Sequence, residues 1–262
     1  MKLPFYQVDA FSNELFGGNP AGVCPLQAWL PAKIMQKITA ENNLAETAFF
    51  VPQDDGYEIK WFTPLVEVNL CGHATLASAH VLYKHLDINT DLIKFASKSG
   101  TLEVKKDGDR ITLDFPADFC DPVAPPAGLI ESLGAEPLVC YHGKTDFMLI
   151  YPDEKDIMNL KPDFTKLGKI EARGIIVSAP GEKVDFVSRF FAPAVGINED
   201  PVTGSAHTSL TPYWSRTLVK TEMKAKQLSE RGGELWVKMM GNRVEISGYA
   251  KTYLEGEIEI PD

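Results

Sequence analysis

The stretch CGHATLA, residues Cys71–Ala77, places a thiol, an imidazole and the start of an apolar helical segment within one turn of chain. A similar stretch, DPVTGSA, occurs at Asp200–Ala206. In both stretches a short polar residue precedes a glycine, and the glycine opens a run that can be helical. The first turn of a helix exposes unpaired N–H groups and a partial positive charge, so it attracts anions. We predict two half-sites for one small, negatively charged ligand.

The segments that follow the two glycines have the period of helices. Residues 73–85 are apolar almost all round, which predicts a buried helix. Residues 205–218 predict a second helix that Pro212 kinks or ends early, because proline lacks the N–H that an interior helical position needs. Further helices are expected at 32–41, directly after Pro31, and at 163–166.

Most of the remaining chain consists of short runs bounded by Gly, Asp or Pro, as is typical of β-strands. The runs that predict strands are 1–9, 57–63, 101–105, 110–115, 138–141, 147–151, 174–178, 185–191, 235–240 and 243–247.

A proline-rich segment, residues 116–126, divides the chain into halves of similar design. Each half has many predicted strands and one buried helix that a Gly turn opens. We therefore predict an α+β protein of two similar domains, residues 1–116 and 117–262, that arose by duplication. The tail from about residue 251 to 262 is expected to pack back on the first domain.

The composition argues against several classes of protein. The chain has 262 residues and a formal net charge of −10, without a cluster of Lys and Arg that would bind nucleic acid. No apolar run approaches the roughly 20 residues of a membrane span, and the N-terminus lacks the features of a signal peptide. The four cysteines stand far apart without a CxxC pair, which predicts neither a zinc site nor a disulfide framework. We expect a cytoplasmic protein without a membrane or nucleic-acid partner.

Glu46 precedes the apolar run Ala48–Val51. A partly desolvated carboxylate there has a raised pKa that suits proton transfer. The alternative is an ordinary solvated Glu at the start of a strand, which the local sequence by itself favours.

His73 stands in the first turn of the apolar helix, where the partial positive charge disfavours the imidazolium. A neutral imidazole at this position could exchange a hydrogen bond with a ligand, or His73 could be a core or capping residue. Both interpretations stay open. No cluster of His, Cys and carboxylate stands at ligand spacing, so no metal is expected.

Asp200 precedes Pro201, which biases it toward an extended conformation before the second Gly turn. Gly204 and Ser205 then offer backbone N–H groups and a hydroxyl to a ligand. An N-cap made by Thr203 or Ser205 is the structural alternative, and it is compatible with ligand binding.

Asn19 lies in the turn-rich segment Gly17–Gly22, which has the wrong spacing for a phosphate-binding loop. Its amide could contact a ligand, but a structural turn is the simpler role.

Six stretches resemble the phenazine-biosynthesis PhzF-like family, in the family's order and across both halves of the chain. They are VDAF at 8–11, GNPAGV at 18–23, NLAETAF at 43–49, WFTP at 61–64, LCGHATLA at 70–77 and EDPVTGSA at 199–206. One such match would be weak, whereas six in order are specific.

The resemblance implies the diaminopimelate-epimerase-like fold, with two similar domains, each a β-barrel-like sheet around a central helix. It also implies an active site in the cleft between the domains, a homodimer, and no cofactor or metal. Glu46 resembles the acid/base that moves a proton between two substrate carbons, and His73 and Asp200 resemble catalytic groups that orient the substrate and assist the movement of the proton. The backbone N–H groups at Gly72 and at Gly204–Ser205 would hold a carboxylate or enolate.

The same comparison supplies a rival function. Racemases and epimerases of this fold use two cysteines, one before each Gly turn. Here Cys71 occupies the first position and Thr203 the second, and a Thr hydroxyl is far too weak an acid to replace a thiol.

We therefore predict a cofactor-independent isomerase that acts on a small carboxylate-bearing substrate. Two alternatives are an epimerase that uses Cys71 with Glu46 or Asp200, and a non-catalytic small-molecule-binding member of the family.

Overall fold

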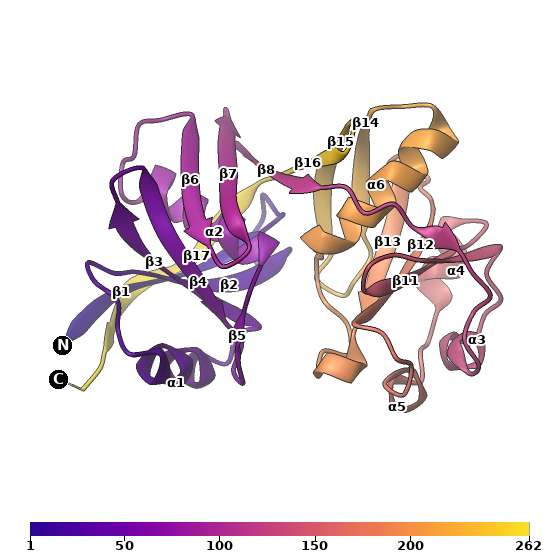
Figure 1. Ribbon diagram of the computed structural model, residues 1–262, viewed down its shortest axis with the longest axis horizontal. Helices are drawn as coiled ribbons and strands as arrows, with labels where there is room; N and C mark the ends of the chain where they lie inside the picture. Colours follow the sequence, from indigo (N-terminus) through magenta and orange to yellow (C-terminus); the bar gives the residue numbers. More distant parts are fainter. Residues whose placement is uncertain (262) are drawn as a thin grey trace. The chain divides into compact units, whose positions relative to one another are not determined.

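The two Gly turns begin the two longest helices of the structure, a computed structural model that describes residues 1–261. Helix α2 spans Gly72–Lys84 and helix α6 spans Gly204–Leu218 (Figure 1). Cys71 and Thr203 stand at the N-caps of these helices with extended backbones. The two stretches chosen from the sequence therefore have the same local structure.

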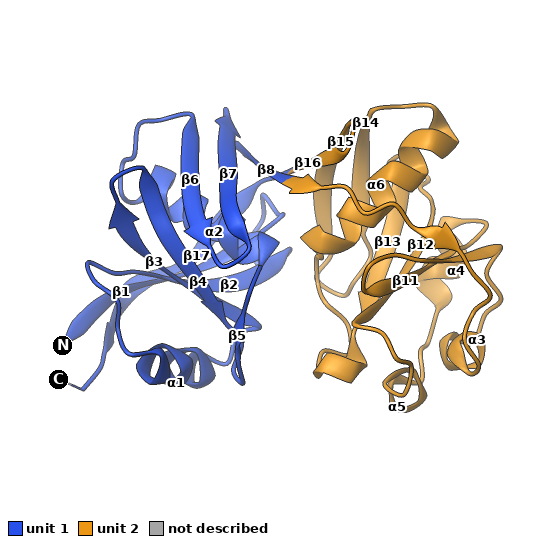
Figure 2. Ribbon diagram, viewed as in Figure 1, with its two compact units in different colours: residues 1–114, 247–262 blue, residues 115–246 orange. Residues whose placement is uncertain are grey.

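The chain divides into two compact units, shown in blue and orange in Figure 2. Unit 1 comprises residues 1–114 and those from 247 onward, and unit 2 comprises residues 115–246. The predicted domains, residues 1–116 and 117–262 with a tail from about 251 that packs back on the first, remain a prediction. No helix in residues 1–261 is long and apolar enough to cross a membrane.

Unit 1 is a sheet that encloses α2. Its elements besides α2 are β1 (Lys2–Ala10), β2 (Asn19–Pro25), α1 (Ala32–Asn42), β3 (Glu46–Gln53), β4 (Gly56–Phe62), β5 (Glu67–Val68), β6 (Leu92–Ser97), β7 (Gly100–Asp107), β8 (Arg110–Pro116) and β17 (Ala250–Glu259).

Three strand pairings in unit 1 place the elements that matter for function. β1 pairs antiparallel with both β2 and β17, which brings the last strand of the chain beside the first. β2 pairs parallel with β3, with Ala21 opposite Glu46. Helix α2 contacts β1, β2, β3 and β17, and nine of its residues are buried, as its apolar sequence predicts.

Unit 2 has the same kind of organisation around α6. Its other elements are β9 (Asp121–Pro122), α3 (Leu129–Leu133), β10 (Val139–His142), β11 (Asp146–Ile150), α4 (Glu154–Asn159), α5 (Phe164–Leu167), β12 (Gly174–Pro180), β13 (Phe186–Phe191), the short 3-10 helix η1 (Pro193–Val195), β14 (Glu222–Gln227), β15 (Gly233–Met240) and β16 (Arg243–Gly248), the last of which ends in unit 1.

The sequence of β12 suits a strand in the middle of the unit 2 sheet. It is buried from Gly174 to Ala179 and lies between β11, to which it is parallel, and β13, to which it is antiparallel. A strand covered on both faces is apolar throughout rather than alternating, and the sequence GIIVSAP has this pattern.

Pro212 does not end helix α6 early, so that part of the prediction is wrong. The helix continues through Pro212 to Leu218. The missing N–H of Pro212 leaves the carbonyl of Thr208 without its helical partner. That carbonyl instead accepts a hydrogen bond of 3.1 Å from the N–H of Asp118. A neighbouring segment of unit 2 thus stabilises a proline that would otherwise break the helix.

Candidate active site

Glu46 and His73 lie in contact in unit 1, although 27 residues separate them in the sequence. Glu46 begins β3, and His73 is the second residue of α2, which packs against β3. His73 Nε2 lies 3.3 Å from Glu46 Oε2, and the two side chains are 7% and 14% exposed. The carboxylate therefore has an imidazole partner and remains partly open to a ligand.

Cys71 completes this cluster. Its Sγ lies 3.6 Å from His73 Nδ1, and its carbonyl accepts hydrogen bonds from the backbone N–H and the hydroxyl of Thr75. Burial raises the pKa of Cys71, so the group is a thiol rather than a thiolate at neutral pH.

The pKa of His73 shifts in the opposite direction to the sequence-based expectation. Burial alone lowers its pKa, but the contacts with Cys71 and with the Glu46 carboxylate outweigh burial and raise the pKa well above its usual value. The shift is opposite to the one expected from the helix N-terminus, because that expectation left out the contacts with Cys71 and with the Glu46 carboxylate.

Glu46, Cys71 and His73 also form a group of potential metal ligands, with one ligand atom from each residue within 4.8 Å of the others. The sequence hides this group because Glu46 stands 25 residues before Cys71. Each member already contacts another member through the ion pair or the thiol–imidazole contact. The absence of a metal cofactor stays a prediction.

Asn19 is fully buried and begins β2, directly after Gly18 with its φ of 66°. It is thus a strand residue rather than a turn residue. Residues two apart on a strand point to the same face, so Asn19 shares a face with Ala21, whose partner in β3 is Glu46. Asn19 therefore stands on the strand next to Glu46, where its assignment to substrate binding remains a prediction.

Asp200 and Thr203 lie together in unit 2 before the first turn of α6. The Thr203 hydroxyl donates a hydrogen bond to the carboxylate of Asp200 instead of capping the helix. The side-chain capping considered from the sequence is therefore absent at Thr203.

Gln227, at the end of β14, holds this turn in place. Its side-chain carbonyl accepts from Thr203 N at 2.9 Å, and its amide donates to the carbonyl of Asp200 at 2.7 Å and to Thr203 Oγ1 at 3.1 Å. The sequence offers no signal for this role, because Gln227 follows Thr203 by 24 residues and belongs to no motif.

Ser205 also has a partner that the sequence does not reveal. Arg173 Nη1 donates to Ser205 Oγ at 3.0 Å, and the same guanidinium forms a two-pronged ion pair with the buried carboxylate of Asp146. The Arg173 side chain is 40% exposed. A cation beside Gly204 and Ser205 adds to the partial positive charge of the α6 N-terminus, which favours a carboxylate ligand there.

His207 belongs to the packing of unit 2 rather than to chemistry. It is fully buried, and its Nδ1 lies 2.8 Å from the carbonyl of Thr203. Its Nε2 has no hydrogen-bond partner within residues 1–261. Burial lowers the pKa of His207 to about 4, so the imidazole is neutral and supports the turn through Nδ1–H.

Acid is expected to destabilise the protein through His207 and through His80 of α2, whose pKa burial and neighbouring cations also lower to about 4. Unfolding restores a value near 6.5, so between pH 6.5 and 4 the unfolded chain binds the extra protons. The free energy of unfolding will fall by up to about 1.4 kcal/mol per pH unit for each histidine as the pH drops. Urea denaturation at several pH values between 5 and 7 measures this slope.

His207→Gln should remove about half of this histidine contribution to the slope. The raised pKa of His73 has the opposite sign, because its stabilisation is complete below pH 6.5 and is lost as the pH rises through the folded value. An identical slope in wild type and His207→Gln would contradict the assignment of His207 as neutral.

The fold identifies the structural class to which the protein belongs. The structure has the diaminopimelate-epimerase-like fold expected from the sequence, and it matches a hydroxyproline epimerase from Agrobacterium vitis with a TM-score of 0.63 over 100% of this chain and 93% of the other. The sequence identity is 10%, so this likeness concerns the fold alone.

The closer comparisons identify the family. The family profile of the phenazine biosynthesis-like proteins, PhzC-PhzF, matches residues 8–256. An uncharacterized isomerase from Pseudomonas aeruginosa is 51% identical over 99% of this chain and 100% of its own length. A crystal structure of a PhzF-family phenazine biosynthesis protein from Enterococcus faecalis has a TM-score of 0.97 at 44% identity, covering 99% of this chain and 100% of the other. The chain belongs to the phenazine biosynthesis-like family and is an isomerase.

Proposed function

We propose that this isomerase moves a proton within a small carboxylate-bearing substrate, without a cofactor, and that Glu46 is its acid/base. One observation carries the proposal: the Glu46 carboxylate is partly buried and paired with His73 at 3.3 Å, at the N-terminus of α2. A general base needs an available carboxylate with a fixed orientation, and the His73 contact supplies the orientation.

The chemistry assigned to unit 1 begins with a C–H bond next to a group that can take up negative charge. The proton passes to Glu46, and the electron pair of the C–H bond spreads into the substrate's carboxylate or double bonds. The first three N–H groups of α2 have no intrahelical acceptor and stabilise such an anion. The His73 imidazole, which is paired with Glu46, lies beside it. Glu46 then returns the proton to a second carbon.

In unit 2 we assign substrate binding and orientation to Asp200, Gly204 and Ser205. The Asp200 carboxylate is oriented by Thr203, and its backbone carbonyl is held by Gln227. Arg173, through its contact with Ser205, provides the positive charge that suits a substrate carboxylate. We also expect a homodimer, which sedimentation velocity measures.

Solvent exchange tests the proposal without knowledge of the natural substrate. The wild-type protein is incubated in heavy water with amino acids, 2-hydroxy acids and unsaturated dicarboxylic acids, and deuterium at carbon is followed by NMR. At least one compound should incorporate deuterium, and dialysis against EDTA should leave the rate unchanged. A rate that falls with EDTA and returns with a divalent metal would refute cofactor independence. Asp200→Asn in the same assay measures the contribution of unit 2.

A thiol-dependent epimerase is the second candidate, because Cys71 Sγ lies 3.6 Å from an imidazole nitrogen of His73. Burial raises the pKa of Cys71, which opposes a thiolate, and Thr203 stands at the corresponding N-cap of α6.

Cys71→Ser should retain the exchange activity to within about fivefold, since the loss of a proton-transfer group typically costs about 10²-fold or more. The measurement is the initial rate of deuterium incorporation for any compound that wild type exchanges. Abolition of exchange in a Cys71→Ser protein with wild-type thermal stability would instead favour the thiol-dependent mechanism.

A further inference from the structure

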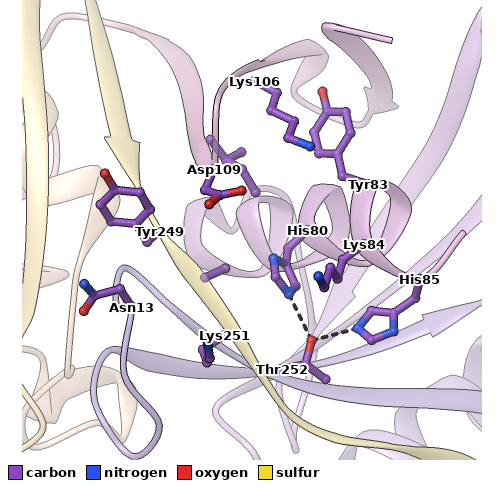
Figure 3. Close-up of a pocket in the computed structure, with 12 residues that line it drawn as sticks. Asn13, His80, Tyr83, Lys84, His85, Lys106, Asp109, Tyr249, Lys251 and Thr252 are labelled. Carbon is purple, nitrogen blue, oxygen red and sulfur yellow. Dashed lines mark hydrogen bonds between the residues drawn. The ribbon is translucent and has the colours of Figure 1, made fainter. Parts of the chain in front are cut away.

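A second concave site lies in unit 1, away from Glu46 and His73. It is a pocket of about 380 Å³ between the last turns of α2, the β7–β8 hairpin and the start of β17 (Figure 3). Lys84 stands eleven residues after His73 on α2, which corresponds to roughly 16 Å along the helix axis. The proton-transfer chemistry proposed above makes no use of this pocket.

The pocket is lined by three lysines, Lys84, Lys106 and Lys251. Within the described residues none of the three forms a salt bridge, whereas Lys94 and Lys98 of the same unit pair with carboxylates. Lys106 is held at the wall by the ring of Tyr83, with Nζ 4.9 Å from the ring centre. Three unneutralised ammonium groups around one cavity create a positive potential.

Two histidines extend this basic wall. His80 Nε2 and His85 Nε2 lie 2.9 and 2.8 Å from the hydroxyl of Thr252, and Figure 3 shows both imidazoles directed at it. A hydroxyl has one proton, so at most one imidazole accepts it and the other must donate its own N–H. Glu255 lies beside His85, with its Oε2 3.3 Å from His85 Nδ1.

Most of the charged groups that line the pocket affect the pKa of His80. After burial, the groups that lower its pKa to about 4 are His85, Lys84, Lys251 and Lys106, all of them basic. The only carboxylate that lines the described pocket is Asp109. Three ammonium groups and one carboxylate give the wall a net charge of about two positive at neutral pH.

We propose that this pocket binds a small phosphate monoester that carries hydroxyl groups. A phosphate monoester has a charge of about −1.5 to −2 at pH 7 and three acceptor oxygens, which matches the unneutralised lysines. Asp109 and Asn13 provide acceptors and donors for the hydroxyls, and the rings of Tyr83 and Tyr249 form part of the wall. A phosphate-bearing ligand of this kind occupies unit 1 independently of the substrate at Glu46.

Titration of the full-length protein with glucose 6-phosphate, glucose and inorganic phosphate tests the assignment. Calorimetry and backbone amide NMR should show saturable binding of glucose 6-phosphate, weaker binding of inorganic phosphate, and none of glucose. Amide shifts should concentrate at residues 80–85, 106–109 and 249–252. The double variant Lys106→Gln/Lys251→Gln should bind glucose 6-phosphate at least about tenfold more weakly, because it loses two charge-assisted contacts.

A matched control variant tests whether the loss of affinity is specific to the lysines of the pocket. Lys33→Gln/Lys37→Gln removes the same charge from the exposed face of α1 in the same unit and should bind as wild type does. Glu46→Gln should also bind glucose 6-phosphate normally. The proposal is overturned if no phosphate compound binds saturably, if the two double variants lose affinity equally, or if the amide shifts concentrate at Glu46 and His73. Thermal melts of each variant establish that all are folded.

Discussion

Glu46→Gln is expected to lower the rate of solvent-deuterium incorporation by about 10³-fold, because a positioned general base contributes about 10² to 10⁴ to such reactions. Glutamine keeps the shape of the side chain but cannot accept the substrate proton. It also removes the negative partner of His73, whose Nε2 lies 3.3 Å from the carboxylate. The measurement compares initial exchange rates of wild type and variant for the same compound in heavy water.

Glu41→Gln is the matched control, since Glu41 is an exposed carboxylate of α1 only five residues earlier in the sequence. Its exchange rate should equal that of wild type. Equal deuterium incorporation by Glu46→Gln and wild type would remove Glu46 from the mechanism. A loss in both variants would show that the assay responds to net charge rather than to the site.

Trp214→Ala should lower the free energy of unfolding by about 3–5 kcal/mol, the range for removing a buried large aromatic side chain. Trp214 is 2% exposed in the middle of α6. Its ring stacks on Phe186 with centres 5.6 Å apart, and its Nε1–H donates to Ser178 Oγ at 2.9 Å. The variant loses this packing and leaves a cavity between α6 and the sheet. Urea denaturation followed by circular dichroism gives the difference.

Two further variants separate packing from hydrogen bonding. Trp214→Phe retains most of the ring and should cost roughly 1–3 kcal/mol, in part because Ser178 Oγ loses its donor. Met158→Ala, at a side chain that is 62% exposed, should change the stability by less than about 0.5 kcal/mol. A Trp214→Ala protein as stable as Met158→Ala would show that α6 does not depend on this contact.

The sequence predicted the elements with strong local patterns. Helix α2 was predictable because its apolar residues continue around the whole helix, and β12 because it is apolar between turn residues. The helix over residues 205–218 was predicted, but its tolerance of Pro212 was not, because the N–H that satisfies the Thr208 carbonyl belongs to Asp118, far away in the sequence. Local pattern determines which segments are regular, and a long-range hydrogen bond determines whether a proline within one is tolerated.

The candidate site likewise has parts that the sequence predicted and parts that it did not. The two Gly turns and the residues beside them were found from the sequence, because helix starts have a recognisable composition. The expected direction of the His73 pKa shift was wrong, because the expectation included the helix terminus but not the contacts with Cys71 and the Glu46 carboxylate. Gln227 and the Arg173–Asp146 pair were missed, since each reaches its turn through tertiary structure and neither belongs to a motif.

The hydroxyl of Thr203 has a consequence for the stereochemistry of the proposed reaction. Where a racemase of this fold has a second thiol, this chain has a hydroxyl whose proton is committed to Asp200 and whose oxygen accepts from Gln227. An isomerase that relies on Glu46 alone must remove and return the proton on the same face of its substrate. The migration is then suprafacial, and part of a deuterium label placed on the first carbon should reappear on the second in ordinary water.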